Sequence, residues 1–133
     1  MTAYAAYLAP IGRVLLAFIF ILAGVQKITG YAGTAGYMEA FGVPGILLPL
    51  VIATELGLGL MLAVGFKARL AALGLAGFSL IAGLLFHFNP ADQMQTILLL
   101  KNIAIAGGLL TVVAHGPGIL ALDNNTSRSL ATA

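Results

Sequence analysis

The sequence predicts an all-α integral membrane protein, a single bundle of four antiparallel transmembrane helices. Two observations on composition support this fold class. Hydrophobic residues make up 61% of the 133-residue chain and charged residues only 8%, whereas about a quarter of the residues in a soluble domain are charged. The mean hydropathy is +1.09. A third observation is that the apolar residues gather in four continuous runs, each long enough to cross a bilayer as a helix.

The four predicted spans cover residues 4–27, 45–66, 68–88 and 93–114. At about 1.5 Å per residue, a helix of each length crosses a hydrocarbon core of roughly 30 Å. Only helices and closed barrels satisfy their backbone groups in lipid, and continuous apolar runs favour helices over alternating strands. We therefore expect residues 1–122 to form the bundle and residues 123–133 to form a polar cytoplasmic tail.

The connections between the spans predict their direction. The second and third spans, and the third and fourth, are joined by the very short segments GFKAR and NPAD, so these neighbours should run up and down. Lys67 and Arg69 favour a cytoplasmic position for the GFKAR loop, which places both termini in the cytoplasm. The longer segment TGYAGTAGYMEAFGVPG, residues 29–45, is predicted to form a short helix at the outer interface.

Three charged side chains lie deep inside the predicted spans. Glu55 is the only ionisable residue of the second span and lies at a depth of roughly 15 Å. Lys101 lies roughly 12 Å from the same side, and Arg13 roughly 13 Å from the opposite side. Each charge would cost on the order of 2.5–3.5 kcal/mol facing lipid. We therefore expect Glu55 to pair with Arg13, Lys101 or both. Asn102, next to Lys101, completes this predicted ligand-binding cluster.

A second polar cluster is predicted at the outer mouth of the bundle, where Lys27 and His87 end their spans and Glu39 follows in the outer segment. The first helix connects the two clusters, because helical spacing places several of its residues on one face. These residues are Arg13, Ala17, Phe20, Gly24 and Lys27.

Each cluster has a structural and a functional interpretation. Buried charges can serve only to fix the register of helices, and a histidine at an interface is more often a capping side chain than a metal ligand. In favour of function, two cations and one carboxylate leave about one uncompensated positive charge, which a bound anion or a polar carbonyl ligand would relieve.

Several classes of function are excluded or unsupported. The chain has no cysteine, so it cannot supply thiolates for disulfide exchange, zinc or iron–sulfur clusters. Six basic residues dispersed along the chain do not form a nucleic-acid surface. No nucleophile–base set, phosphate loop or metal-ligand spacing is visible, and the motifs alone leave open whether the protein is an enzyme.

The chain resembles the DoxX family of small four-helix bacterial membrane proteins. The stretches that carry the resemblance are GRVLLAFIFILAGVQKI, FGVPGILLPLVIATELGLGLMLAVGFKARLAA, FHF, LLLKN and HGPGILALD. The resemblance implies a multi-pass protein of the bacterial inner membrane. Polar positions typical of the family correspond to Arg13, Lys27, Glu55, His87 and Lys101.

The resemblance also implies a type of activity. The family is linked to thiosulfate:quinone oxidoreduction and to soluble sulfur-handling or antioxidant enzymes, so the first hypothesis is an accessory redox subunit in the lipid bilayer. It would hold no intrinsic cofactor and would interact with a quinone, or with a soluble or membrane redox protein. The alternatives are a non-catalytic scaffold or assembly factor, and a transporter of a small anion or proton-coupled solute. The transporter would have to be a homo-oligomer.

Overall fold

The computed structural model describes residues 3–125, which are helical apart from short connections. The helices are α1 (Ala3–Thr29), α2 (Tyr31–Ala40), η1 (Gly45–Leu47), α3 (Leu48–Ile52), η2 (Ala53–Leu58), α4 (Gly59–Val64), α5 (Ala68–Phe86) and α6 (Gln93–His115). The segments η1, α3, η2 and α4 follow one another as one rod, which we call the second span. The four segments long and apolar enough to cross a membrane are α1, the second span, α5 and α6, which confirms the predicted fold class.

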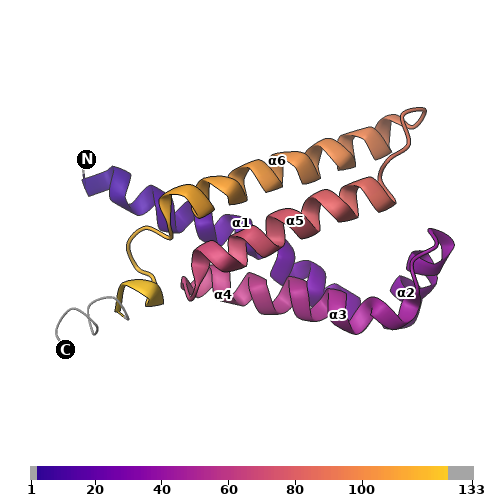
Figure 1. Ribbon diagram of the computed structural model, residues 1–133, viewed down its shortest axis with the longest axis horizontal. Helices are drawn as coiled ribbons and strands as arrows, with labels where there is room; N and C mark the ends of the chain where they lie inside the picture. Colours follow the sequence, from indigo (N-terminus) through magenta and orange to yellow (C-terminus); the bar gives the residue numbers. More distant parts are fainter. Residues whose placement is uncertain (1–2, 126–133) are drawn as a thin grey trace.

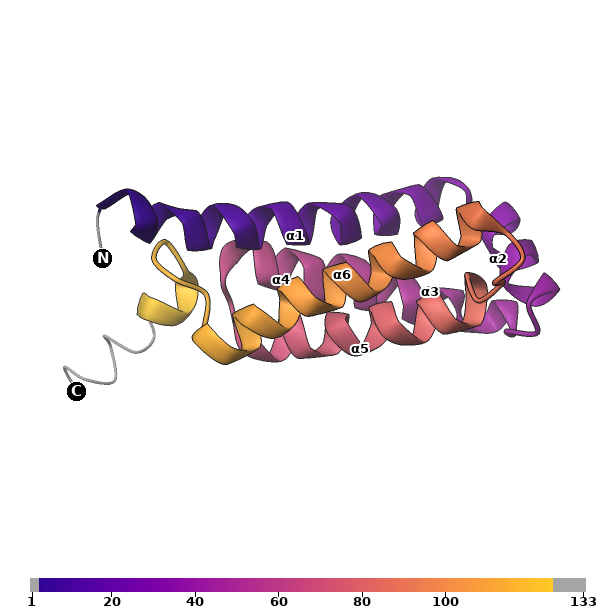
Figure 2. The ribbon, with the colours of Figure 1, turned by 90° about the horizontal axis from the view of Figure 1, so that it is seen from above.

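The helices form two pairs (Figures 1 and 2). One pair is α1 packed along the second span. The other is the α5–α6 hairpin, which lies across the first pair. The start of α1, the α4–α5 connection and residues 116–125 gather at one end of the bundle. Helix α2 and the α5–α6 connection lie at the other end. We call the first the Arg13 end, because the side chain of Arg13 binds the chain there. We call the second the pocket end, because a cavity described below lies there. Which of the two faces the cytoplasm stays a prediction.

Glycines set the register between α1 and the second span. A Cβ atom on Gly24 would lie 2.9 Å from the Cβ of Leu56, and one on Gly59 would lie 3.1 Å from the side chain of Ile21. Backbones can approach this closely only where a side chain is missing. The inward face of α1 is the predicted one, since its buried residues after Pro10 are Arg13, Ala17, Phe20 and Gly24.

The C-terminal segment after α6 folds back onto the Arg13 end, and we call residues 116–125 the C-terminal strap. Arg13 is 2% exposed and donates hydrogen bonds to the carbonyls of Pro117 (2.5 Å) and Leu120 (2.9 Å). Asp123 accepts from the backbone amides of Lys67 and Ala68. This carboxylate therefore caps the N-terminus of α5, where a negative charge is favourable.

Residues 123–125 of the strap are also the start of the segment that the sequence predicts to be a polar cytoplasmic tail. Asp123 lies on the bundle end, and the side-chain amide of Asn124 donates to the carbonyl of Gly118. Residues 126–133 lie outside the described part of the chain.

Candidate functional site

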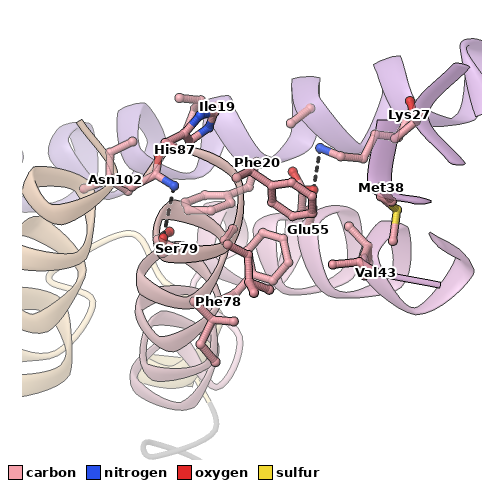
Figure 3. Close-up of a pocket in the computed structure, with 18 of the residues that line it drawn as sticks. Ile19, Phe20, Lys27, Met38, Val43, Glu55, Phe78, Ser79, His87 and Asn102 are labelled. Carbon is pink, nitrogen blue, oxygen red and sulfur yellow. Dashed lines mark hydrogen bonds and ion pairs between the residues drawn. The ribbon is translucent and has the colours of Figure 1, made fainter. Parts of the chain in front are cut away.

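A cavity of about 360 Å³ lies at the pocket end between both helix pairs and α2 (Figure 3). Its volume is in the range of small-molecule sites, which run from about 300 to 1,000 Å³. The lining is mainly aliphatic and aromatic. The polar and ionisable residues that line it are Lys27, Thr34, Tyr37, Glu55, Ser79, His87, Lys101 and Asn102. An apolar cavity with a few convergent polar groups is the usual composition of a ligand site.

Part of the cavity lining reaches the outer surface of the bundle. Several residues that line the cavity are also exposed on the outer surface of the bundle, among them Ile81 and Leu85 on α5. At the pocket end, the rings of Tyr37 and Phe41 contact Phe86, with centroid distances of 5.6 and 5.4 Å. These contacts join α2 and the loop after it to the end of α5.

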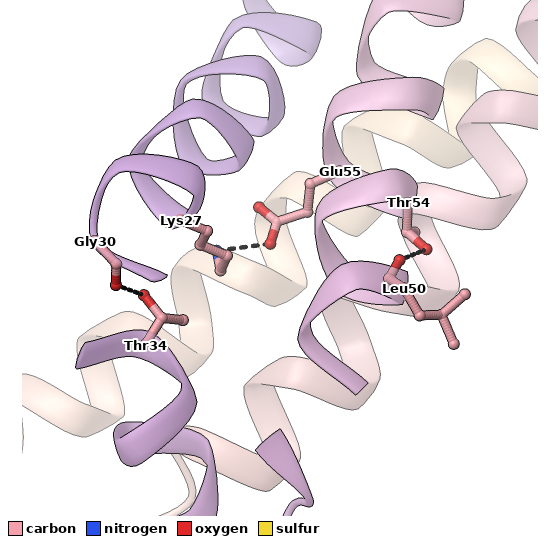
Figure 4. Close-up of polar contacts among 6 residues, drawn as sticks. All are labelled: Lys27, Gly30, Thr34, Leu50, Thr54 and Glu55. Carbon is pink, nitrogen blue, oxygen red and sulfur yellow. Dashed lines mark hydrogen bonds and ion pairs between the residues drawn. The ribbon is translucent and has the colours of Figure 1, made fainter. Parts of the chain in front are cut away.

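Glu55 and Lys27 form an ion pair on the wall between α1 and the second span (Figure 4). Lys27 Nζ lies 2.6 Å from Glu55 Oε1, and the two side chains are 27% and 4% exposed. Glu55 lies on the π-helical segment η2, just after Thr54, whose hydroxyl donates to the carbonyl of Leu50. Such π-helical turns are rare and often occur at functional sites. Here the turn carries the only charged residue of the second span.

Asn102 contributes to the wall formed by α5 and α6. Its side-chain nitrogen donates to the carbonyl of Ser79 over 3.0 Å (Figure 3). Gly83 lies opposite and leaves room for this contact, because a Cβ there would lie 3.1 Å from the Cβ of Asn102. With the nitrogen engaged, the amide oxygen of Asn102 can accept a hydrogen bond from a ligand.

His87 lies at the end of α5, and its ring is held by α6. Nδ1 lies 2.8 Å from Oε1 of Gln95. Because an amide oxygen can only accept, Nδ1 must carry the proton, and Nε2 of a neutral ring is left as an acceptor. Gln95 is oriented in turn by the N-cap of α6, where the Asp92 carboxylate accepts from the amides of Met94 and Gln95.

Replacing Gln95 with leucine should change the tautomer of His87 without unfolding the bundle. The wild-type ring should be mainly in the Nδ1–H form, and the Gln95→Leu variant should shift toward the Nε2–H form, which predominates in free histidine. The ¹⁵N chemical shifts of the labelled ring report this directly. Gln95→Glu retains an acceptor and serves as the matched control. A ring that is mainly Nε2–H in the wild type would show that Gln95 does not set the tautomer.

Lys101 also lines the cavity, but its side chain is exposed at the surface of α6. Among residues 3–125 it has no hydrogen bond and no ion pair. Glu55, the carboxylate that lines the same cavity, is already paired with Lys27. Lys101 therefore contributes an uncompensated positive charge to the site.

The predicted pairing of Glu55 with Arg13 or Lys101 is wrong, because the carboxylate pairs with Lys27. The prediction measured depth from the first residue of each span, as if all spans began in one plane. The contact between Gly24 and Leu56 instead brings Lys27, about one turn further along α1, level with Glu55. Arg13 lies on the same face of α1 at the opposite end, roughly 21 Å away along the helix axis.

The structure therefore divides the predicted clusters differently. Lys27 and His87 of the outer-mouth cluster share one cavity with Glu55, Lys101 and Asn102. Two predicted site residues lie elsewhere. Arg13 binds the C-terminal strap, and the Glu39 carboxylate lies against Gly45, where a Cβ would be 2.6 Å from its Oε1. The transporter hypothesis relied on a central cluster of Arg13, Glu55 and Lys101, and this cluster does not form.

Four polar residues at the site were missed by sequence reasoning. They are Thr34, Tyr37, Ser79 and Gln95. Ser79 and Gln95 carry a detectable signal, since a polar residue on an otherwise apolar span can be expected to face inward. Within residues 3–125 no group of three His, Cys, Asp or Glu side chains could hold a metal ion.

Four helices long and apolar enough to span a membrane, around a cavity with an ion pair in its wall, define a small integral membrane protein with a candidate ligand site. The family model described as DoxX matches residues 8–88, and the chain belongs to the DoxX family. It is similar to inner membrane protein YqjF of Escherichia coli strain K12, with 49% identity over 85% of this chain and 87% of the relative.

A second relative is inner membrane protein YphA of the same strain, with 31% identity over 85% of this chain and 86% of the relative. No solved structure matches the chain. Taken with the four spans, these relatives identify the protein as a multi-pass protein of the bacterial inner membrane.

Proposed function

We propose that this protein binds a quinone or quinol in this cavity and serves as the membrane subunit of a redox system. The observation that carries the proposal is the Lys27–Glu55 ion pair, with Glu55 on a π-helical turn, in the wall of a mainly apolar cavity. A quinone is a flat apolar ring with two opposed carbonyl oxygens. It needs an apolar slot with hydrogen-bond donors on separate walls, which Lys27 and Lys101 supply.

The same residues suit the proton transfers of quinone chemistry. Reducing a quinone to a quinol takes up two electrons and two protons, and oxidation of the quinol releases them. Oε2 of Glu55 has no hydrogen bond or ion pair within the described residues, and Nε2 of His87 is the acceptor of its ring. Both could exchange a proton with a ligand hydroxyl. The chain has no redox cofactor motif, so the electrons would pass through a partner protein.

A binding titration tests the proposal. The protein is placed in phosphatidylcholine nanodiscs and titrated with 1,4-naphthoquinone, and saturable binding is expected. Ala82→Phe fills the cavity from α5 and should weaken binding at least tenfold, because the ring takes the space of the ligand. Ala104→Phe adds the same ring on the exposed face of α6, away from the cavity, and should leave binding unchanged. Equal binding by both variants, or none by the wild type, would contradict the proposal.

A further inference from the structure

The charges around the cavity do not balance. Its ionisable lining residues are Lys27, Glu55, His87 and Lys101. Lys27 and Glu55 neutralise each other at 2.6 Å. With His87 neutral, the ammonium group of Lys101 leaves the cavity with a net formal charge of +1.

No acidic side chain nearby corrects this imbalance. Glu39 lies on α2 against Gly45, outside the cavity lining. Asp92 caps the N-terminus of α6, where it accepts from the amides of Met94 and Gln95. Both carboxylates are therefore placed elsewhere, and Lys101 has no partner among residues 3–125.

Because of its depth in α6, leaving the charge of Lys101 without a counter-charge is unfavourable in free energy. Lys101 lies eight residues into α6, at roughly 12 Å along the helix from Gln93. Extending its chain toward water relieves part of the cost of a cation at this depth. A negative group held in the cavity would relieve it directly, and a charge-assisted hydrogen bond is stronger than one between neutral groups.

We propose that the cavity selects a lipophilic monoanion, a quinone that carries one ionised hydroxyl or carboxyl group, and that Lys101 is the residue that recognises the charge. This inference rests on the proposed function and narrows its ligand class. The apolar body lies among the aliphatic and aromatic side chains of α1 and α5. The single negative charge lies at Lys101 and brings the net charge of the occupied cavity to zero.

The test compares two probes that differ mainly in charge. At neutral pH, 2-hydroxy-1,4-naphthoquinone is an anion, and its methyl ether, 2-methoxy-1,4-naphthoquinone, is neutral. In phosphatidylcholine nanodiscs the wild type should bind the anion about tenfold more tightly than the ether. Lys101→Gln should abolish this preference, and Lys101→Arg should retain it. Thr111→Val, on the same helix outside the cavity, should behave as the wild type.

The remaining outcomes separate this inference from the proposed function. Equal binding of the two probes by the wild type would overturn charge selection while leaving the quinone site intact. Binding of neither probe would contradict both. The inference would also be overturned if the preference for the anionic probe disappeared when phosphatidylglycerol is added to the nanodiscs. Lys101 would then bind a lipid headgroup. The comparison in the wild type needs no variant, so it stands even if a variant fails to fold.

Discussion

Replacing Lys27 with methionine should destabilise the protein by about 3–5 kcal/mol, the usual cost of removing one partner of a buried ion pair. The substitution leaves the Glu55 carboxylate, 4% exposed, in an apolar cavity without its counter-charge. The free energy of unfolding can be measured by titration with sodium dodecyl sulfate in mixed micelles, followed by circular dichroism. Lys67→Met removes a lysine from the exposed α4–α5 connection and should change the stability little.

A second substitution distinguishes loss of the ion pair from loss of packing. In the Lys27→Met/Glu55→Gln double variant neither half of the ion pair is left as an unpaired charge, so most of the lost stability should return. If the double variant is as unstable as Lys27→Met alone, the lysine stem rather than the ion pair holds α1 to the second span. The double variant is also the better background for ligand titrations, because it retains the fold while removing the ion pair from the cavity wall.

The parts of the fold that depend on local sequence could be predicted. Hydropathy alone located the spans, and helical spacing placed Arg13, Ala17, Phe20 and Gly24 on the inward face of α1, which the structure confirms. Both predictions concern a single helix in a known environment. Lipid requires continuous helices, and it penalises a charge on the outer face.

Relations between helices could not be predicted in the same way. The register of α1 against the second span depends on Gly24, which packs on Leu56, and Gly24 looks like many other glycines in these apolar runs. A shift of one turn would move Glu55 by about 5.4 Å along α1, which is enough to take it out of level with Lys27. The folding back of the C-terminal strap likewise follows from partners distant in sequence, Arg13 and the start of α5.

The two ends of the bundle therefore have separate roles, although α1 runs through both. At the pocket end the polar groups have unused donors and acceptors, as a ligand site requires. At the Arg13 end they bind the chain itself, since Arg13 donates to the carbonyls of Ala63, Pro117 and Leu120. Arg13, one of the polar positions typical of the family, thus holds the C-terminal strap against the bundle in this chain.

Replacing Arg13 with methionine should release the C-terminal strap and destabilise the bundle by at least about 3 kcal/mol, because hydrogen bonds to a charged group contribute about 1.5–3 kcal/mol each. Arg13→Lys keeps the charge, but a single ammonium group cannot reproduce the planar fork that reaches carbonyls on both the strap and α4. It should be intermediate in stability. Both variants can be compared with the wild type in the same detergent titration.

Hydrogen–deuterium exchange shows where the Arg13→Met variant loosens. The strap should exchange faster, and so should the amides of Lys67 and Ala68, which lose the Asp123 cap when the strap is released. Segments around Lys27 and Glu55 should keep their wild-type protection, because the cavity does not include Arg13. Faster exchange at both ends would mean that Arg13 supports the whole bundle. Unchanged exchange in the strap would contradict its role as the residue that holds the C-terminus.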